Sequence, residues 1–374
     1  MAEALDPARK HVRTRVLTDI GHPSQAWVLR PILSDLMQRG ATVEVVAREK
    51  DALPALLAGF NIPYSIPVPR GRGLPGQILE FVRREAHVVA RALKTRPALL
   101  IGSSFHVARA GFLSGGTSIV FNEDDAKVVP LIRWLAYPLA SRIVTPRCLS
   151  FENYGARHLT YPGSQKLFYL HPNRFQPNPS VRKYVGDGKY AIVRLSALDA
   201  HHDRNIRGIE TGDILALQRE LGEDVRLLVN SEKPLPGELA AHALRLPPEL
   251  MHHAMAFAEF FIGDSQSMTV ESALLGVPAI RVNDFVGRIS VVRELETAGL
   301  CFGFRPDEGR TAIDLAVRLA RDPSTRATWS ERRRRYLSEC DDPLPWLLAE
   351  IDAALAIKRG QDGSRPPDGP VLAR

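Results

Sequence analysis

The 374-residue sequence is poor in cysteine, and it contains no long uninterrupted apolar segment. The three cysteines, Cys148, Cys301 and Cys340, follow neither metal-ligand nor Cys-x-x-Cys spacing, so we expect no disulfide framework and no metal site. No segment reaches the ~18 apolar residues of a membrane-spanning helix. The charged residues 1–15 also lack the apolar core of a signal peptide. These absences predict a cytoplasmic protein that requires no metal.

The charge of the chain is basic but unevenly distributed. A net charge of +7 is compatible with a partner that is nucleic acid, anionic lipid or a phosphorylated small molecule. Much of the excess lies in residues 331–336 ("ERRRRY") and 358–374. We expect the first of these runs to form a solvated helix face. Because it lacks interleaved aromatic residues, we expect no nucleic-acid partner.

Residues 128–140 ("VVPLIRWLAYPLA") are the most apolar stretch, and Pro130, Arg133 and Pro138 interrupt them. The pattern favours a short helix that faces the protein core, although Trp134 and Tyr137 would also suit a membrane interface. The sequence therefore predicts a core-facing helix and leaves a peripheral membrane contact open.

Short β-branched runs alternate with helical patterns along most of the chain, which predicts parallel sheets with helices on both faces. In the first half, strands are expected at residues 15–20, 42–49, 98–104 and 118–125, an extended segment or strand at 62–69, and helices at 26–40, 52–60, 74–96 and 106–115. In the second half, strands are expected at residues 190–197, 225–232, 260–264 and 277–283, and helices at 213–222, 248–258 and 267–276.

The alternation breaks once, in a stretch rich in proline and glycine. This break divides the chain into an N-terminal α/β domain (1–165), a linker (166–188) and a C-terminal α/β domain (189–340). A further amphipathic helix is predicted at 343–357, followed by a disordered tail at 358–374.

Polar residues gather where the predicted strands of the N-terminal domain end, which is where open parallel sheets bind ligands. Gly21 and His22 follow the first strand, and Glu123 and Asp124 follow a later one, beside Asp125. Glycine permits a close backbone approach, and histidine or one of several crowded carboxylates can act as a general base. A turn glycine, a helix-capping histidine and acidic helix caps are equally compatible with the pattern.

Two stretches of the C-terminal domain have the same character. Arg194 and Ser196 follow its first strand, ahead of His201, His202 and Asp203. Adjacent histidines cannot easily face one ion from a regular strand or helix, so we expect no zinc there.

The second stretch, residues 263–281 ("GDSQSMTVESALLGVPAIR"), reads as a strand exit, a turn and a helix start. Side chains and backbone amides at the positive end of a helix form a site for an anion such as a diphosphate. The residues expected to form it are Asp264, Ser265, Gln266, Ser267, Met268 and Thr269. Glu271, further along the helix, is placed to accept hydrogen bonds from a ribose diol.

The spacing of Asp264, Ser265, Glu271, Gly276 and Pro278 resembles the donor-nucleotide motif of GT-B glycosyltransferases and of the hydrolysing UDP-N-acetylglucosamine 2-epimerases. Together with "TDIGHPSQ", "IVFNEDDAKVV" and "YPGSQKLFYLHPNRFQPNPSV", it resembles the DUF354 family of predicted glycosyltransferases over roughly residues 14 to 350.

The resemblance implies two Rossmann-like domains that face a central cleft, with the last helix crossing back to the N-terminal domain. It further implies a metal-independent enzyme of surface polysaccharide or glycolipid biosynthesis, at the inner face of the membrane if its acceptor is lipid-linked. The C-terminal domain would bind the NDP-sugar donor, and Gly21 would lie beside the nucleotide. The N-terminal domain would bind a glycan or lipid-linked acceptor. His22, Glu123 or Asp124 would be the base.

A 2-epimerase and a non-catalytic nucleotide- or glycan-binding protein remain open. The epimerases' "HVEAG" and "HRREN" segments are replaced here by "FNEDD" and "RLSALDAHHD". The sequence does not determine the oligomeric state.

Overall fold

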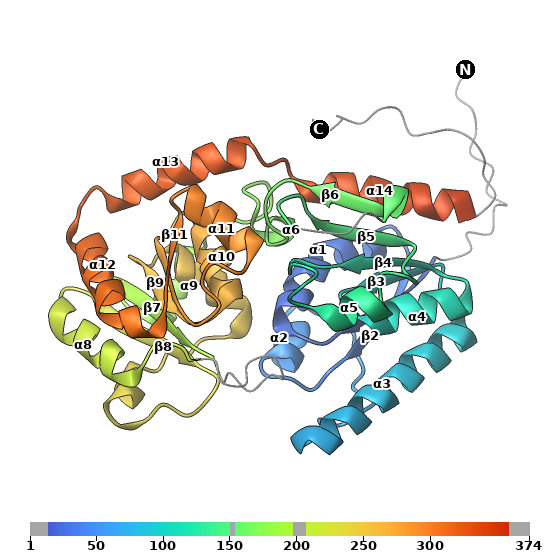
Figure 1. Cartoon of the computed structure of the whole chain (residues 1–374), viewed down its shortest axis with the longest axis horizontal. Coiled ribbons are helices and arrows are strands. Elements are labelled where there is room, and N and C mark those ends of the chain that lie inside the picture. The colour runs from blue at the N-terminus through green and yellow to red at the C-terminus, as the bar shows by residue number, and fades with distance from the viewer. Residues whose placement is uncertain (1–13, 150–153, 197–206, 359–374) are drawn as a thin grey trace.

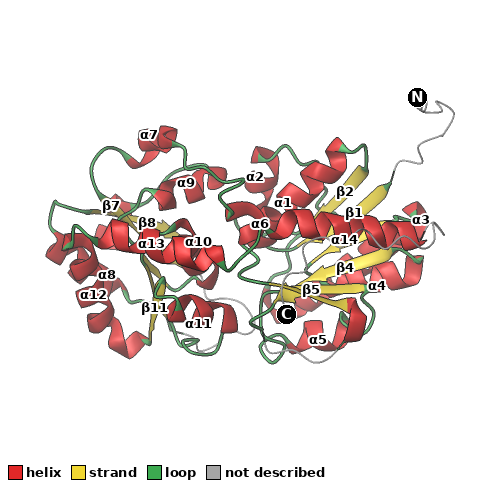
Figure 2. Cartoon of the chain, turned by 90° about the horizontal axis from the view of Figure 1, so that it is seen from above, coloured by secondary structure: helices red, strands yellow, loops and turns green. Residues whose placement is uncertain are grey.

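The computed structural model describes residues 14–149, 154–196 and 207–358, which form two α/β domains side by side (Figure 1). Each domain is built on one parallel sheet with helices on both faces, as Figure 2 shows from above. This confirms the predicted fold class. None of the helices in these three ranges is long and apolar enough to cross a membrane.

The N-terminal sheet has the strand order β2-β1-β3-β4-β5-β6, and every neighbouring pair is parallel. Along β1 the side chains alternate between two cores. Val16 and Ile20 pack toward α1, whereas Leu17 packs toward α3 and α4 with Val88 and Val107. The elements are β1 Arg15–Ile20, α1 Pro23–Gln38, β2 Thr42–Ala47, α2 Leu53–Gly59, α3 Gly73–Thr95, β3 Leu99–Gly102, α4 Phe105–Ser114, β4 Thr117–Phe121, α5 Pro130–Leu135, β5 Arg142–Pro146 and β6 His158–Tyr161.

The C-terminal sheet has the order β11-β10-β9-β7-β8 and is also parallel. Helices α8 and α12 cover one face, and α9, α10 and α11 cover the other. The elements are β7 Tyr190–Leu195, α8 Thr211–Leu221, β8 Arg226–Ser231, α9 Met251–Ala256, β9 Phe261–Gly263, α10 Gln266–Leu275, β10 Ala279–Val282, α11 Ser290–Thr297, β11 Cys301–Phe304, α12 Gly309–Arg321 and α13 Thr325–Ser338.

Residues 166–188, predicted as a linker, contain the short helices α6 (Leu167–Leu170) and α7 (Arg182–Val185). All four residues of α6 are buried in a core cluster that also takes in α1 and α10, so this segment is packed between the domains. Helix α14 (Pro343–Lys358) crosses back onto the N-terminal domain (Figure 1), where Asp352 pairs with Arg39, the C-cap of α1. The predicted disordered tail lies outside the described residues from 359 onward.

Three expectations about local structure are met only in part. Residues 62–69 are not a strand but an irregular segment with one isolated bridge, from Ser65 to Val46. Helix α5 faces the core on one side only: Ile132 packs against the buried Tyr137 that follows the helix, but no residue of α5 itself is buried. The arginine run on α13 is only partly a solvated face, because Arg332 donates to the Gly299 carbonyl and Arg333 to that of Leu274. These two cations stabilise the carbonyls at the ends of neighbouring helices.

Candidate functional site

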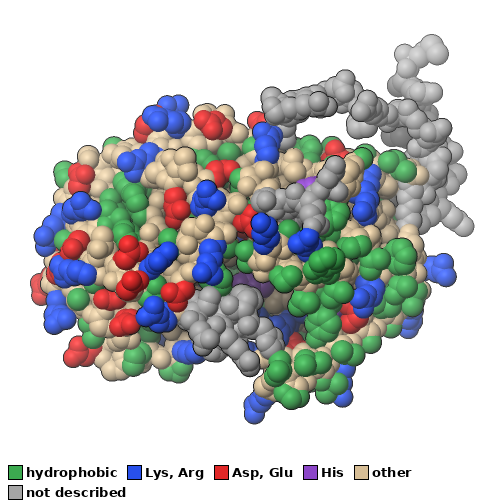
Figure 3. Space-filling view, in the orientation of Figure 1, with side chains coloured by type: hydrophobic (Ala, Val, Ile, Leu, Met, Phe, Trp, Pro, Cys, Tyr) green, Lys and Arg blue, Asp and Glu red, His purple; other side chains and the backbone are tan. Residues whose placement is uncertain are grey.

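The polar residues predicted in each domain meet where the two domains face each other, and Figure 3 shows the surface hollowed between them. Asp124 follows β4 in the N-terminal domain, and Gln266 begins α10 in the C-terminal domain. The Gln266 Nε2 donates to Asp124 Oδ1 at 3.3 Å. The two sites inferred separately from the sequence therefore form one interdomain site.

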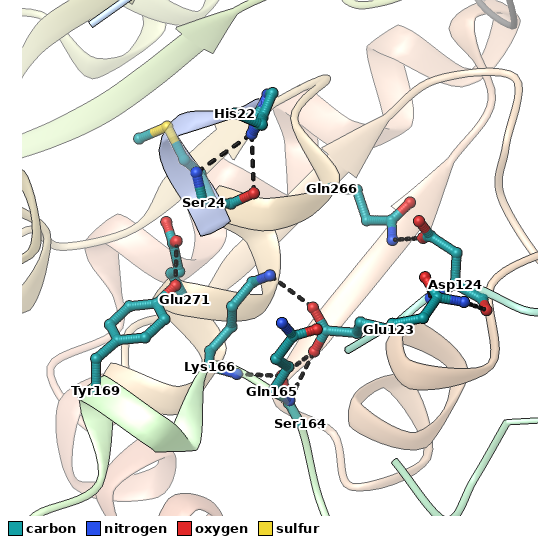
Figure 4. Close-up of polar contacts among 12 residues, drawn as sticks. His22, Ser24, Glu123, Asp124, Ser164, Gln165, Lys166, Tyr169, Gln266 and Glu271 are labelled. Atoms are coloured by element: carbon teal, nitrogen blue, oxygen red, sulfur yellow. Dashed lines mark hydrogen bonds and ion pairs between the residues drawn. The ribbon is translucent and has the colours of Figure 1, made fainter. Parts of the chain in front are cut away.

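His22 caps the N-terminus of α1, because its Nδ1 accepts a hydrogen bond from the Ser24 N–H at 3.2 Å (Figure 4). Burial, together with the charges of Lys50, Lys166 and Arg194, lowers the pKa of His22 to about 3, so the ring is neutral at physiological pH. A neutral imidazole that accepts at Nδ1 carries its proton on Nε2. In this tautomer His22 presents a hydrogen-bond donor at Nε2.

Gly21 lies in the turn between β1 and this cap, where its N–H donates to Gln25 Oε1 at 2.8 Å. A Cβ atom at this position would lie 3.2 Å from Nη1 of Arg84. Arg84 is buried and pairs with Asp19 at the end of β1. Glycine therefore allows this ion pair to sit directly beneath the turn, and the backbone remains close to the site.

Glu123 is buried and its carboxylate is surrounded by donors (Figure 4). Its Oε1 accepts from Ser164 Oγ at 2.5 Å and from the Gln165 N–H at 2.8 Å, and its Oε2 pairs with Lys166 Nζ at 2.5 Å. Burial alone would lower the pKa of Lys166, but the charges of Glu123 and Glu271 outweigh burial and raise it. Glu123 therefore acts in this structure as the partner of a buried cation.

The three adjacent carboxylates do not crowd one another as the sequence suggested. Glu123 turns toward Lys166 and Asp124 toward Gln266. Asp125 accepts from both the N–H of Ser290, at 2.9 Å, and its hydroxyl, at 2.7 Å. A carboxylate at a helix N-terminus is favoured, so Asp125 caps α11 of the other domain. Asp124 is the one of the three that is only partly buried.

The side chains at the start of α10 mostly serve the helix itself. Ser265 is the N-cap, with its Oγ accepting from the Met268 N–H at 3.4 Å, and the buried Thr269 hydroxyl donates to the Ser265 carbonyl at 2.8 Å. The backbone N–H groups of Gln266 and Ser267 have no acceptor among the described residues. These first-turn amides have no partner within the helix, and the start of a helix offers such groups to an anion.

Of the remaining predicted residues of the C-terminal domain, Asp264 and Ser196 brace this turn, whereas the Arg194 side chain is held at the end of β8. The buried Asp264 accepts from the Ser196 N–H at 2.8 Å, and burial raises the pKa of its carboxyl. Arg194 donates to Asn230 and pairs with Glu232. His201, His202 and Asp203 lie outside the described residues.

Glu271 is buried within α10, and both of its oxygens have protein partners. Tyr169 of α6 donates to Oε1 at 2.6 Å, and His252 Nε2 lies 3.2 Å from Oε2. Burial alone would raise the pKa of Glu271, but the charges of His252 and Lys166 and the hydrogen bonds from His252 and Tyr169 lower it. In this structure Glu271 joins α6 to α9 and α10.

Two residues of the site, Lys166 and Tyr169, were not predicted from the sequence, although both lie in the motif "YPGSQKLFYL". In Figure 4 the Lys166 side chain lies between Glu123 and Glu271. A lysine directly before an apolar run is the only local signal. Its partner, Glu123, lies 43 positions earlier in the chain, so no local pattern identifies the pair.

No family model matches the sequence, and no curated protein matches it. Solved structures do match. They include the S. aureus MnaA–UDP co-structure (TM-score 0.63, 16% identity, 95% of this chain and 100% of that chain). The UDP-GlcNAc 2-epimerase from Neisseria meningitidis bound to UDP-GlcNAc is also similar (TM-score 0.60, 13% identity, 85% and 94%).

A third similar structure is Anabaena Alr3699/HepE in complex with UDP and glucose (TM-score 0.60, 16% identity, 91% of this chain and 99% of that chain). At these identities the similarity establishes the fold alone. Since these two matches cover 95% and 91% of this chain, the agreement extends over both domains. The chain therefore has the GT-B fold, with its candidate site between the two domains.

Proposed function

We propose that this protein is a GT-B glycosyltransferase that takes an NDP-sugar donor, most simply a UDP-sugar, and transfers the sugar to a glycan or lipid-linked acceptor. The observation that carries the proposal is the open first turn of α10 directly opposite Asp124. An anion-binding helix start and a carboxylate on facing domains are what a donor diphosphate and an acceptor hydroxyl require. Membership of the DUF354 family is part of the same proposal.

The backbone amides of Gln266 and Ser267 bind the diphosphate and stabilise the charge that develops on it as the sugar departs. Asp124 accepts the proton of the acceptor hydroxyl, because Glu123 is engaged by Lys166 and Asp125 by Ser290. His22 donates through Nε2 to an oxygen of the donor. Glu271 binds the ribose after exchanging one of its present partners for a hydroxyl of the ligand. These groups provide the chemistry without a metal.

A UDP-N-acetylglucosamine 2-epimerase is the second candidate. Several structures with this fold carry that name, with TM-scores of 0.60 to 0.65. The epimerase reaction requires an acid or base at the sugar C2, and Glu123 occupies the motif position of the epimerase acid. Three donors around Glu123 disfavour that role, since proton transfer would break a buried ion pair.

Incubation with UDP-N-acetylglucosamine alone, followed by NMR, separates the two candidates. A transferase without an acceptor forms no N-acetylmannosamine, whereas an epimerase forms N-acetylmannosamine or its UDP derivative. A thermal-shift screen with a panel of nucleotide sugars identifies the donor, because a ligand that binds only the folded state raises the melting temperature. The absence of any shift across UDP-, GDP-, dTDP- and CDP-sugars would contradict both candidates.

A further inference from the structure

Large apolar side chains are exposed mainly on one face of the N-terminal domain. Of the 13 such side chains exposed in the described part of the chain, most lie on three adjacent helices. Figure 3 shows them as a hydrophobic area on the right of the view, where few acidic side chains are visible. The members, here called the α3–α5 face, are Leu74, Ile78, Leu79, Phe81, Val82, Leu93, Phe112, Leu113, Leu131 and Trp134.

The first half of α3 is amphipathic in the reverse sense of a water-facing helix. Its buried side carries Glu80 and Arg84, which pair with Arg48 and Asp19. Its outer side carries Leu74, Ile78 and Val82, spaced four residues apart, with exposed fractions of 44, 56 and 55%. A surface helix ordinarily buries its apolar stripe and exposes its charges. The reversed arrangement is favourable when an apolar phase covers the outer side.

Helix α5 continues this face and ends in an amphipathic side chain. Leu131 and Trp134 are 64 and 67% exposed, and the helix contains no buried residue. The Arg133 guanidinium lies 5.0 Å from the centre of the Trp134 ring. Tryptophan beside a basic residue is typical of the boundary between lipid headgroups and acyl chains.

On the chain segments that carry the α3–α5 face, the exposed charges are of one sign. Between residues 52 and 122, the charged side chains classed as exposed are all basic. Residues 126–149 contain no aspartate or glutamate. The two acidic residues of α3 are both paired, Glu80 with Arg48 and Glu85 with His106. The exposed bases are Arg70, Arg72, Arg83, Lys94 and Arg96, followed by Lys127 and Arg147.

We infer that the α3–α5 face docks on an anionic lipid bilayer, with its apolar side chains in the headgroup region and its arginines on the lipid phosphates. An exposed apolar patch of ten large side chains, bordered by charges of one sign, marks an interaction surface. A second copy of the chain is a poorer occupant, because two like-charged rims would face each other. A bilayer that carries anionic lipids would bury the apolar side chains and attract the bases to its phosphate groups.

The direct test is co-sedimentation of the full chain with phosphatidylcholine vesicles that contain 25% phosphatidylglycerol, without donor or acceptor. The result is therefore independent of the proposed glycosyl transfer. We expect binding that weakens at 0.5 M salt and nearly disappears with phosphatidylcholine alone. Absence of binding to the anionic vesicles would overturn the inference.

Two variants test the two parts of the face. Ile78→Ser/Leu79→Ser/Val82→Ser is expected to lower the partition coefficient at least about tenfold. Its control, Tyr184→Ser/Ile357→Ser, removes exposed apolar side chains outside the face and should bind as the wild type does. Arg72→Glu/Arg83→Glu is expected to lower binding at least about 25-fold, since each of the two bases near an anionic surface contributes about fivefold. Its charge-matched control, Arg318→Glu/Arg335→Glu, should have less effect.

A second readout does not depend on multiple substitutions. Trp134 is the one exposed tryptophan among the described residues, so vesicles should shift the emission of the wild type to shorter wavelength, and Trp134→Phe should lose that shift. Analytical ultracentrifugation completes the test. If the triple variant converts a dimer to a monomer while vesicle binding is unchanged, the face belongs to a second copy of the chain and the inference is wrong.

Discussion

Asp124 of the N-terminal domain and Gln266 of the C-terminal domain are joined by a 3.3 Å hydrogen bond between the two domains. The bond links the end of β4 to the first residue of α10. A carboxylate that acts on an acceptor and an amide-rich helix start that binds a donor would have to lie this close.

Asp124 is the proposed base, so Asp124→Asn should remove catalysis while leaving donor binding in place. General-base catalysis contributes about 10²- to 10⁴-fold, and we expect kcat to fall by at least about 10²-fold. Asparagine retains an oxygen that can accept from Gln266, so the domain contact is preserved. UDP affinity within about twofold of wild type is the matching expectation. A variant with full activity would place the base elsewhere.

The buried pair of Glu123 and Lys166 should be strongly coupled. Lys166→Met leaves the Glu123 charge without its cation, and such a loss costs about 3–5 kcal/mol of unfolding free energy. The double variant Glu123→Gln/Lys166→Met should cost clearly less than the sum of the two single variants, since no uncompensated charge remains. Urea denaturation of the four proteins measures the coupling. Additive costs would mean that the pair does not interact as the distances indicate.

The position of His22 predicts a separation of stability from activity. His22→Ala should lose about 1 kcal/mol because the cap of α1 is removed. His22→Asn keeps a capping oxygen, so it should restore that stability. It does not restore the Nε2 donor, so the loss of activity should persist. Recovery of activity in His22→Asn would show that His22 serves only as a helix cap.

The lowered pKa of His22 also predicts a pH dependence of stability. The folded state keeps His22 neutral down to about pH 3, whereas an unfolded histidine binds a proton below about pH 6.5. Between these values the unfolded state therefore binds more protons, and the free energy of unfolding rises with pH before becoming level above about 6.5. Denaturation at pH 4, 5, 6 and 8 should show a shallower rise for His22→Asn. Parallel curves for the two proteins would contradict the lowered pKa.

Glu271 offers a test of whether the carboxylate changes partners on binding. If it binds the ribose, Glu271→Gln should weaken UDP binding. Tyr169→Phe, which frees Oε1, should bind UDP at least as tightly as the wild type. Calorimetry with UDP on both variants distinguishes ribose binding by Glu271 from a purely structural role. In a purely structural role, each substitution would lower the melting temperature and leave the affinity of the folded protein for UDP unchanged.

Regular strands and amphipathic helices could be predicted from the sequence because they carry a local signal. β1 lies at its predicted residues, and α3 and α14 lie within one residue of theirs. The short strands β5, β6 and β11 were missed, since four or five residues next to proline or charge carry little periodicity. For α5, the apolar pattern was visible, but sequence periodicity does not reveal whether an apolar side faces the core or the solvent.

The site could be predicted only in part for the same reason. The loops after β4 and β9 were identified because polar residues follow apolar strands. What each side chain does depends on residues far away in the chain. Lys166 neutralises Glu123, and Tyr169 occupies Glu271 from a position 102 residues away. The hydroxyls of Ser265 and Thr269 were expected to bind an anion, and the sequence did not show that each also forms a hydrogen bond with the backbone of the α10 start.

The central claim is that the backbone amides at the start of α10 bind the diphosphate of the donor. Gln266→Pro removes one of these amides at the first helical position, where proline is tolerated, and Gln266→Ala removes the side chain but keeps the amide. Calorimetry with UDP measures both variants against the wild type. We predict that Gln266→Ala binds UDP within about threefold of the wild type and that Gln266→Pro loses about tenfold or more, the cost of one hydrogen bond to a charged group. Equal affinities for the two variants, or no UDP binding by the wild type, would contradict the account.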